Sequence, residues 1–110
     1  MPKGEYLGEF EQIVLAALLH LGPQAYGMAV RRAIEERTGR AVSIGAVYAT
    51  LDRLEEKGYV SSSVGEATPE RGGRAKRFFR LEQPGERVLR ASLDAMRKMT
   101  AGLSATWRTA

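Results

Sequence analysis

The chain has 110 residues and a mass of 12.1 kDa, which allows one hydrophobic core, and its net charge of +4 favours a polyanionic partner. It has no cysteine and one histidine, so disulfides, thiolate metal sites and a cysteine nucleophile are excluded, and we expect no metal or cofactor. The longest apolar run is shorter than the roughly 20 residues that span a bilayer, and the N-terminus lacks a signal-peptide pattern, so we expect a cytoplasmic protein without a membrane partner.

Two helices are predicted in the first forty residues. Apolar side chains follow helical spacing over residues 10–21, and Gly22 with Pro23 ends this run. Because this segment is apolar over more than half of its circumference, we expect it to be buried against several neighbours. A second helix is predicted from residue 24 or 26 to residue 38, with Gly39 as its C-terminal stop.

A third helix is predicted to start at Ser43, whose hydroxyl suits the N-cap position. Val47, Leu51 and Leu54 recur at i, i+4 and i+7 and form one apolar stripe. Gly58 stands where a helix ends in the left-handed conformation. The short link from the second helix is typical of a helix-turn-helix.

The opposite face of this third helix is almost free of bulky side chains in its first turns. A helix with such an end brings its backbone amides close to another surface, and free N–H groups with the helix dipole favour phosphate there. The alternative is an ordinary surface helix that contains several small residues. The face comprises Gly45, Ala46, Ala49, Asp52 and Arg53, with Tyr48 on its flank.

A basic β-hairpin is predicted after the third helix. Residues 59–64 and 75–81 suit two strands, and residues 67–73 between them suit a turn with Pro69 and two glycines. No acidic residue occurs between positions 71 and 80. A charged edge hairpin that avoids aggregation is the alternative explanation, but it accounts poorly for charges of a single sign. The five basic residues are Arg71, Arg74, Lys76, Arg77 and Arg80.

A single long helix is predicted at the C-terminus, with Pro84 in its first turn. Its apolar positions have the heptad spacing of a coiled-coil seam, and a domain this small cannot cover so long a stripe. We therefore expect a homodimer, with an ordinary core helix as the alternative. The predicted interface consists of Phe10, Leu89, Leu93, Met96, Leu103 and Trp107.

Three segments resemble the PadR-like family of transcriptional regulators. They are LGEFEQIVLAALLHLGPQAYGMAV (7–30), SIGAVYATLDRLEEKGYV (43–60) and GGRAKRFFRLEQPGE (72–86). The resemblance implies a mainly α (α+β) fold, a winged helix-turn-helix in residues 1–82 followed by a C-terminal dimerisation helix in residues 83–110. The single C-terminal helix is similar to the short subgroup of that family.

The resemblance also implies roles for particular residues. Tyr48 corresponds to a tyrosine that contacts the DNA backbone, and the wing segment corresponds to Gly73, Arg74, Lys76 and Arg77. The chain departs from the family pattern at three places. These are Phe78-Phe79 in place of a tyrosine pair, Glu82 in place of a capping threonine, and Gly72-Gly73 in place of Gly-Pro.

The predicted function is a homodimeric, sequence-specific DNA-binding repressor that acts on an inverted-repeat operator. The helix at residues 43–57 would enter the major groove, and the wing at residues 66–80 would contact flanking DNA. Asp52 would repel phosphate unless it points at a base donor, pairs with Arg53 or lies outside the contact. The predicted DNA-binding residues are Ser43, Gly45, Ala46, Tyr48, Ala49, Arg53, Arg71, Gly73, Arg74, Lys76 and Arg77.

Two other functions are compatible with parts of the sequence. A small-molecule effector would fit between the subunits against Met96, Met99, Leu103 and Trp107, although dimer packing also explains Trp107. A winged helix used only for protein contacts is disfavoured by the basic wing. No His, Ser or carboxylate pair has a recognisable catalytic arrangement, so we expect no enzyme.

Overall fold

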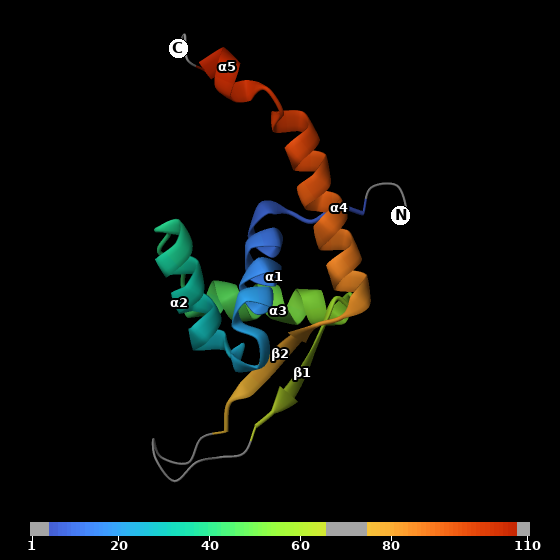
Figure 1. Ribbon diagram of the computed structural model, residues 1–110. Coiled ribbons are helices and arrows are strands. Elements are labelled where there is room, and N and C mark those ends of the chain that lie inside the picture. The colour runs from blue at the N-terminus through green and yellow to red at the C-terminus, as the bar shows by residue number, and fades with distance from the viewer. Residues whose placement is uncertain (1–4, 66–74, 108–110) are drawn as a thin grey trace.

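The computed structural model describes residues 5–65 and 75–107, and it is mainly helical with one antiparallel hairpin (Figure 1). This agrees with the predicted fold class. The predicted wing tip, with Arg71, Gly73 and Arg74, lies outside the described residues. The elements are α1 (Glu9–Leu21), a 3-10 turn η1 (Gly22–Gln24), α2 (Gly27–Thr38), α3 (Ile44–Glu56), β1 (Val60–Val64), β2 (Arg77–Leu81), α4 (Gln83–Thr100) and α5 (Leu103–Trp107).

Helix α1 is the centre of the fold. It packs against α2, α3, α4 and β2, which confirms the prediction that it is buried against several neighbours. In Figure 1 it lies in front of α3, with α2 on one side and α4 on the other. Burying apolar surface from all these elements against one helix forms a single core. Its fully buried large side chains are Val14, Leu15, Val30, Ile34, Val47, Leu51 and Leu54.

The ends of α2 and α3 are set by the residues that the sequence indicated. The Ser43 hydroxyl accepts a hydrogen bond from the Ala46 amide at 3.0 Å and so caps α3. Gly39 and Gly58 have φ angles of 75° and 80°, in the left-handed region that glycine adopts without steric cost. The predicted cap and both predicted stops are confirmed, and they fix where α2 ends and where α3 begins and ends.

Strand β2 is hydrogen-bonded along both edges. On one edge it pairs antiparallel with β1, from Val60 opposite Leu81 to Val64 opposite Arg77. On the other edge the Phe79 amide donates to the carbonyl oxygen of Ala25 at 2.8 Å, next to a β-bridge between Tyr26 and Phe78. The described strand starts at Arg77, two residues later than predicted. The base of the wing is thus joined directly to the segment that leads into α2.

The start of α4 fits closely against β1. Gly85 is buried, and a Cβ atom at this position would overlap the carbonyl oxygen of Tyr59. Glu82 occupies the N-cap position but makes no side-chain cap, in keeping with the missing threonine. Its carboxylate instead accepts a hydrogen bond from Ser61, which, together with the neighbouring Arg80, lowers the pKa of Glu82 below its ordinary value. Helix α4 therefore leaves the domain in a direction fixed by packing rather than by a cap.

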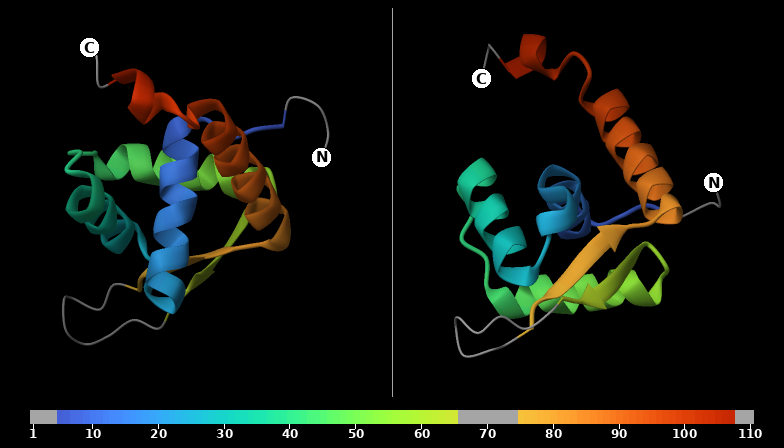
Figure 2. Two further views of the ribbon diagram at one scale, coloured as in Figure 1. Left: turned by 45° about the horizontal axis from the view of Figure 1, so that its top comes forward. Right: turned by 60° about the horizontal axis from the view of Figure 1, so that its bottom comes forward.

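Only the first half of α4 packs on the domain. Val88, Leu89 and Ser92 are buried, and the Ser92 hydroxyl accepts a hydrogen bond from the Leu7 amide at 2.9 Å. The second half projects outwards (Figure 2). The radius of gyration is 16.3 Å, against about 13 Å for a compact chain of this length. In residues 5–65 and 75–107, no helix combines the length and apolarity needed to cross a membrane.

The prediction of one uninterrupted C-terminal helix is wrong. Helix α4 ends at Thr100, and α5 follows after Ala101 and Gly102, whose φ angle of 83° is incompatible with a right-handed helix. The heptad spacing continues through this break, but a glycine in the left-handed conformation prevents one continuous stripe. The predicted seam therefore divides into a part on α4 and a part on α5.

Candidate nucleic-acid interface

The outer face of α3 exposes backbone rather than side chains in its first two turns. Gly45, Ala46 and Ala49 are exposed, and a Cβ atom built on Gly45 would have no neighbour within 4 Å. Figure 2 (right) shows α3 along the lower side of the molecule, with α4 and α5 rising away from it. A flat, small-residue helix surface of this kind can approach the floor of a groove closely.

Tyr48 stands beside this surface, and its ring is held by packing. The half-buried ring lies over Gly27 at the start of α2, where a Cβ atom would overlap Tyr48 Cζ and Oη. The ring of Phe79 lies 6.4 Å away between centroids, in a tilted arrangement. The absence of a side chain at Gly27 thus sets how closely α2 and α3 approach one another at this end.

We expect Gly27→Ala to destabilise the fold by about 1–3 kcal/mol, because the added methyl group forces Tyr48 from its position. Gly27 does not have a positive φ, and alanine is the better helix former. Backbone conformation alone therefore predicts that Gly27→Ala stabilises the fold. Urea unfolding of Gly27→Ala, Tyr48→Ala and the double variant tests this. Strictly additive effects in that cycle would show that the two positions do not interact.

An ion-pair network joins the wing to α3. The Arg77 guanidinium lies 3.0 Å from Asp52 and 2.6 Å from Glu55, and Ser62 also donates to Glu55 at 2.8 Å. The same guanidinium lies 4.7 Å from the ring centroid of Phe79. The network therefore holds β2 against the outer face of α3 and offsets the negative charge of Asp52.

This network involves two charged residues that were considered from the sequence. Arg77 remains a predicted DNA contact, and both of its terminal nitrogens contact carboxylates of α3 in this structure. Of the three alternatives for Asp52, the pairing with Arg53 is wrong, because Asp52 pairs with Arg77. The alternation of residues in β2 placed Arg77 on the same face as Phe79, but sequence spacing gave no information on which carboxylates of α3 would face it.

Arg53 is held only weakly. Its side chain is 54% exposed, with Nε 4.0 Å from Glu11 and a terminal nitrogen 3.5 Å from the Thr50 hydroxyl, both at the outer limit of such contacts. Glu11 lies closer to Lys57, at 3.3 Å. Arg53 is therefore the long side chain of this face with the greatest freedom to turn towards a ligand.

Three side chains gather where β2 meets the start of α2, and we call them the Tyr26 cluster: Tyr26, Arg32 and Lys76. Arg32 donates a hydrogen bond to the Tyr26 hydroxyl at 2.8 Å, and Lys76 Nζ lies 4.1 Å from the centre of the ring. Desolvation opposes ionisation of Tyr26, but the hydrogen bond from Arg32 and the charge of Lys76 outweigh it, so the pKa of this phenol is lowered. The sequence did not indicate Tyr26 and Arg32 as site residues, because it is the bridge between Tyr26 and Phe78 that brings them to Lys76.

The predicted dimer residues divide into covered and uncovered ones. Leu89 is only 2% exposed and belongs to the chain's own core, so it has no free surface for a partner. Phe10 is half-buried, with the Arg40 guanidinium 6.0 Å from its ring centroid. Leu103 is half-buried on α5. The large apolar side chains left uncovered on α4 and α5 are Leu93, Met96, Met99 and Trp107.

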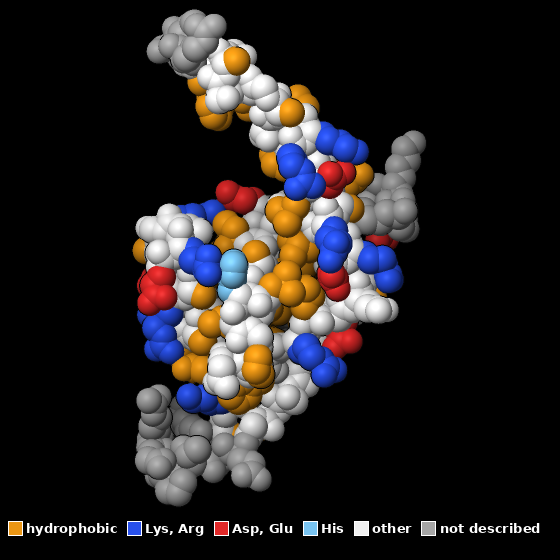
Figure 3. Space-filling view, in the orientation of Figure 1, with side chains coloured by type: hydrophobic (Ala, Val, Ile, Leu, Met, Phe, Trp, Pro, Cys, Tyr) orange, Lys and Arg blue, Asp and Glu red, His pale blue; other side chains and the backbone are white. Residues whose placement is uncertain are grey.

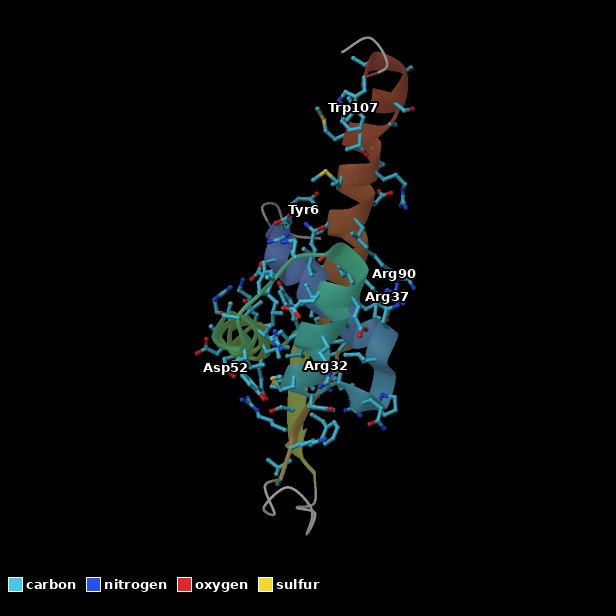
Figure 4. The ribbon with its side chains drawn as sticks, turned by 90° about the vertical axis from the view of Figure 1, so that its left-hand side faces the viewer. Tyr6, Arg32, Arg37, Asp52, Arg90 and Trp107 are labelled. Atoms are coloured by element: carbon cyan, nitrogen blue, oxygen red, sulfur yellow. The ribbon has the colours of Figure 1, made fainter. Side chains whose placement is uncertain are left out.

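These uncovered residues lie far from α3. Figure 4 shows Trp107 at one end of the molecule, with Asp52 and Arg32 near the other end, close to the hairpin. Figure 3 shows hydrophobic side chains in a band between α1 and α4 that continues along the projecting part of α4. The molecule therefore has two separate surfaces: one of small and charged side chains around α3 and β2, and an apolar one on α4 and α5.

A helix pair with an exposed, small-residue second helix, followed by a hairpin with a basic strand, defines a winged helix-turn-helix protein. The family model of the transcriptional regulator PadR-like family matches residues 14–91. The chain belongs to this family, and it is a transcriptional regulator rather than an enzyme. DNA binding is implied by this membership.

Solved structures support the same fold. A PadR family regulator from Eggerthella lenta DSM 2243 is similar with a TM-score of 0.73 and 24% identity, over 92% of this chain and 83% of that one. RosR from H. salinarum is similar with a TM-score of 0.65 and 27% identity, over 87% of this chain and 79% of that one. A transcriptional regulator from Clostridium thermocellum is similar with a TM-score of 0.71 and 21% identity, over 88% of this chain and 87% of that one. No curated protein sequence matches the chain significantly.

Proposed function

We propose that the protein is a cytoplasmic, homodimeric repressor that binds an inverted-repeat DNA operator. The observation that carries this proposal is the exposed, side-chain-poor face of α3 beside the basic strand β2. Such a face allows the helix to enter the major groove, where base edges can be distinguished. Arg53 is the residue we assign to base contacts, while Ser43, Tyr48 and Lys76 are assigned to the backbone. A dimer that covers the start of a gene would hinder polymerase, which is the basis for proposing repression.

The projecting half of α4 supports the dimer. Met96 and Met99 lie on the same helix face as Leu89 and Ser92, but they extend beyond the region that the chain's own domain covers. An apolar stripe that starts inside a core and continues into solvent is best completed by a second copy of the same stripe. A two-fold axis at α4 would leave both α3 helices free, with half-sites about one helical turn, roughly 34–36 Å, apart.

DNA binding is expected to depend steeply on salt. If each dimer contacts several phosphates, log K falls with log salt by about 0.9 per phosphate. Fluorescence anisotropy with an operator selected from random duplex DNA, measured between roughly 0.05 and 0.3 M salt, gives this slope. A scrambled duplex of equal length is the control for sequence preference. A flat salt response would contradict the assignment of the surface around α3 and β2 to DNA.

A ligand-responsive sensor is the second candidate function. It is supported by the exposure of Met99 and Trp107 on the apolar surface, where a flat hydrophobic compound could insert between subunits. Trp107 is the only tryptophan, so its fluorescence reports directly on this site. A compound that quenches this fluorescence and also releases the operator would support the sensor, whereas quenching without release would not.

A further inference from the structure

Most basic side chains of the described residues are neutralised by nearby carboxylates, but a few are not. Residues 5–65 and 75–107 contain ten salt bridges, and these include the salt bridges of Arg53 on α3 and of Arg77 on β2. The basic residues of this part of the chain that form no ion pair with a described carboxylate are Arg32, Arg37, Lys76 and Arg87.

Two of these four unneutralised cations meet at a single phenol. Arg32 donates to the hydroxyl of Tyr26 and Lys76 lies over its ring, so two positive charges share a partner that carries no charge of its own. Two like charges held this close repel one another, and an anion placed between them would remove the repulsion. The lowered pKa of Tyr26 reports the same positive potential at this point.

The Tyr26 cluster is located beside the end of α3 that carries Tyr48. Tyr26 directly precedes Gly27, on which the ring of Tyr48 rests, so the cluster and α3 share one packed junction. Lys76 directly precedes β2, the strand that Arg77 attaches to α3. Figure 4 shows Arg32 close to the hairpin, while Arg37 lies higher on the same helix. An anion bound here would therefore lie next to the α3 surface.

We propose that Arg32, Lys76 and the Tyr26 hydroxyl form a clamp for one phosphate of the DNA backbone beside the major groove that α3 enters. The clamp rests on the proposed DNA-binding function and adds a defined phosphate site to it. Tyr26 acts as the positioning residue, because its hydroxyl and ring orient the two cations before DNA arrives. The contact fixes the register of α3 on the duplex and carries no base preference.

The test compares charge-matched variants on the selected operator. Arg32→Gln and Lys76→Gln each remove one clamp charge, and Arg37→Gln removes one unneutralised charge from the far end of the same helix. We expect the two clamp variants to bind at least roughly tenfold more weakly. With one phosphate lost per subunit, the salt slope of the dimer should fall by about 1.8. Tyr26→Phe should give a smaller loss, because the ring under Lys76 remains. Thermal unfolding checks that each variant is folded.

A second experiment replaces single phosphates of the operator by an uncharged analogue. Methylphosphonate is placed at one backbone position at a time in each half-site of the operator. Wild type should lose affinity at a position flanking the major groove, and Arg32→Gln should be insensitive at that same position. Replacing chloride by inorganic phosphate at constant ionic strength should leave wild-type binding unchanged.

Other results would overturn the clamp. Equal losses for Arg32→Gln and Arg37→Gln, or no loss for either clamp variant, would overturn the clamp while leaving DNA binding intact. Selective competition by inorganic phosphate in wild type, absent in Arg32→Gln, would identify a free-anion site and also overturn it. If wild type itself binds no duplex DNA, the proposed function fails, and the clamp fails with it.

Discussion

The combined substitutions Leu93→Glu and Met96→Glu are expected to give a folded monomer with operator affinity lowered by a factor of about 10² to 10⁴. Leu93 is 45% exposed and Met96 56% exposed within the chain, so their own domain tolerates the change. In the proposed dimer the same side chains are buried, and the burial of each contributes roughly 1.5–3 kcal/mol to association. The four carboxylates that the substitutions add to the dimer interface would also repel one another. A monomer holds one half-site alone and loses the advantage of linked binding.

Analytical ultracentrifugation of this double variant, followed by operator titration, provides the measurement. The matched control is Arg87→Gln with Lys98→Gln, which makes the same change in net charge on the polar face of α4. The control should remain dimeric. A double variant that stays dimeric and binds normally would show that α4 is not the interface, and the inverted-repeat operator would lose its basis.

Ala49→Glu is expected to lower operator affinity about 100-fold or more without measurable loss of stability. Ala49 is exposed on the outer face of α3, so a longer side chain meets no protein atoms there, and surface changes of this kind are usually within about 0.5 kcal/mol. In the complex, the same carboxylate would face base edges and phosphates, and like-charge contact costs several kcal/mol at an interface. Arg77, the nearest cation of β2, already pairs with Asp52 and Glu55 and so does not compensate the added charge.

Ala49→Ser separates charge from size in this experiment. Serine is nearly as small as alanine and neutral, so it should change affinity by no more than a few-fold. Urea unfolding confirms that both variants are folded, and anisotropy on the operator gives the affinities. If Ala49→Glu binds as wild type does, the outer face of α3 does not contact DNA.

Local signals in the sequence were sufficient to predict most of the fold. Helix ends at Ser43, Gly39 and Gly58 depend on single residues whose backbone preferences or hydroxyl groups act within one turn, and these predictions are confirmed. The end of α4 was missed although Gly102 was visible. A glycine within a regular heptad pattern is compatible with a continuous helix, and only its left-handed conformation reveals the break.

The candidate site was less predictable, because its contacts join segments distant in sequence. Small residues at Gly45, Ala46 and Ala49 were recognisable from helical spacing alone. The pairing of Arg77 with Asp52 spans 25 positions and depends on the angle between β2 and α3. The Tyr26 cluster depends on the extra hydrogen bonds of β2, for which the sequence has no spacing rule.

The double pairing of β2 affects how this protein would select its DNA. A strand bonded along both edges, with Phe79 donating to Ala25 on one side and β1 on the other, cannot tilt without breaking hydrogen bonds. Arg77 adds a second restraint between the same strand and α3. The separation between the base of the wing and α3 is therefore fixed before DNA binds. Since the groove width of DNA varies with its sequence, we expect the protein to favour duplexes whose groove width in the free state matches this separation. This preference would act even at base pairs that no side chain touches.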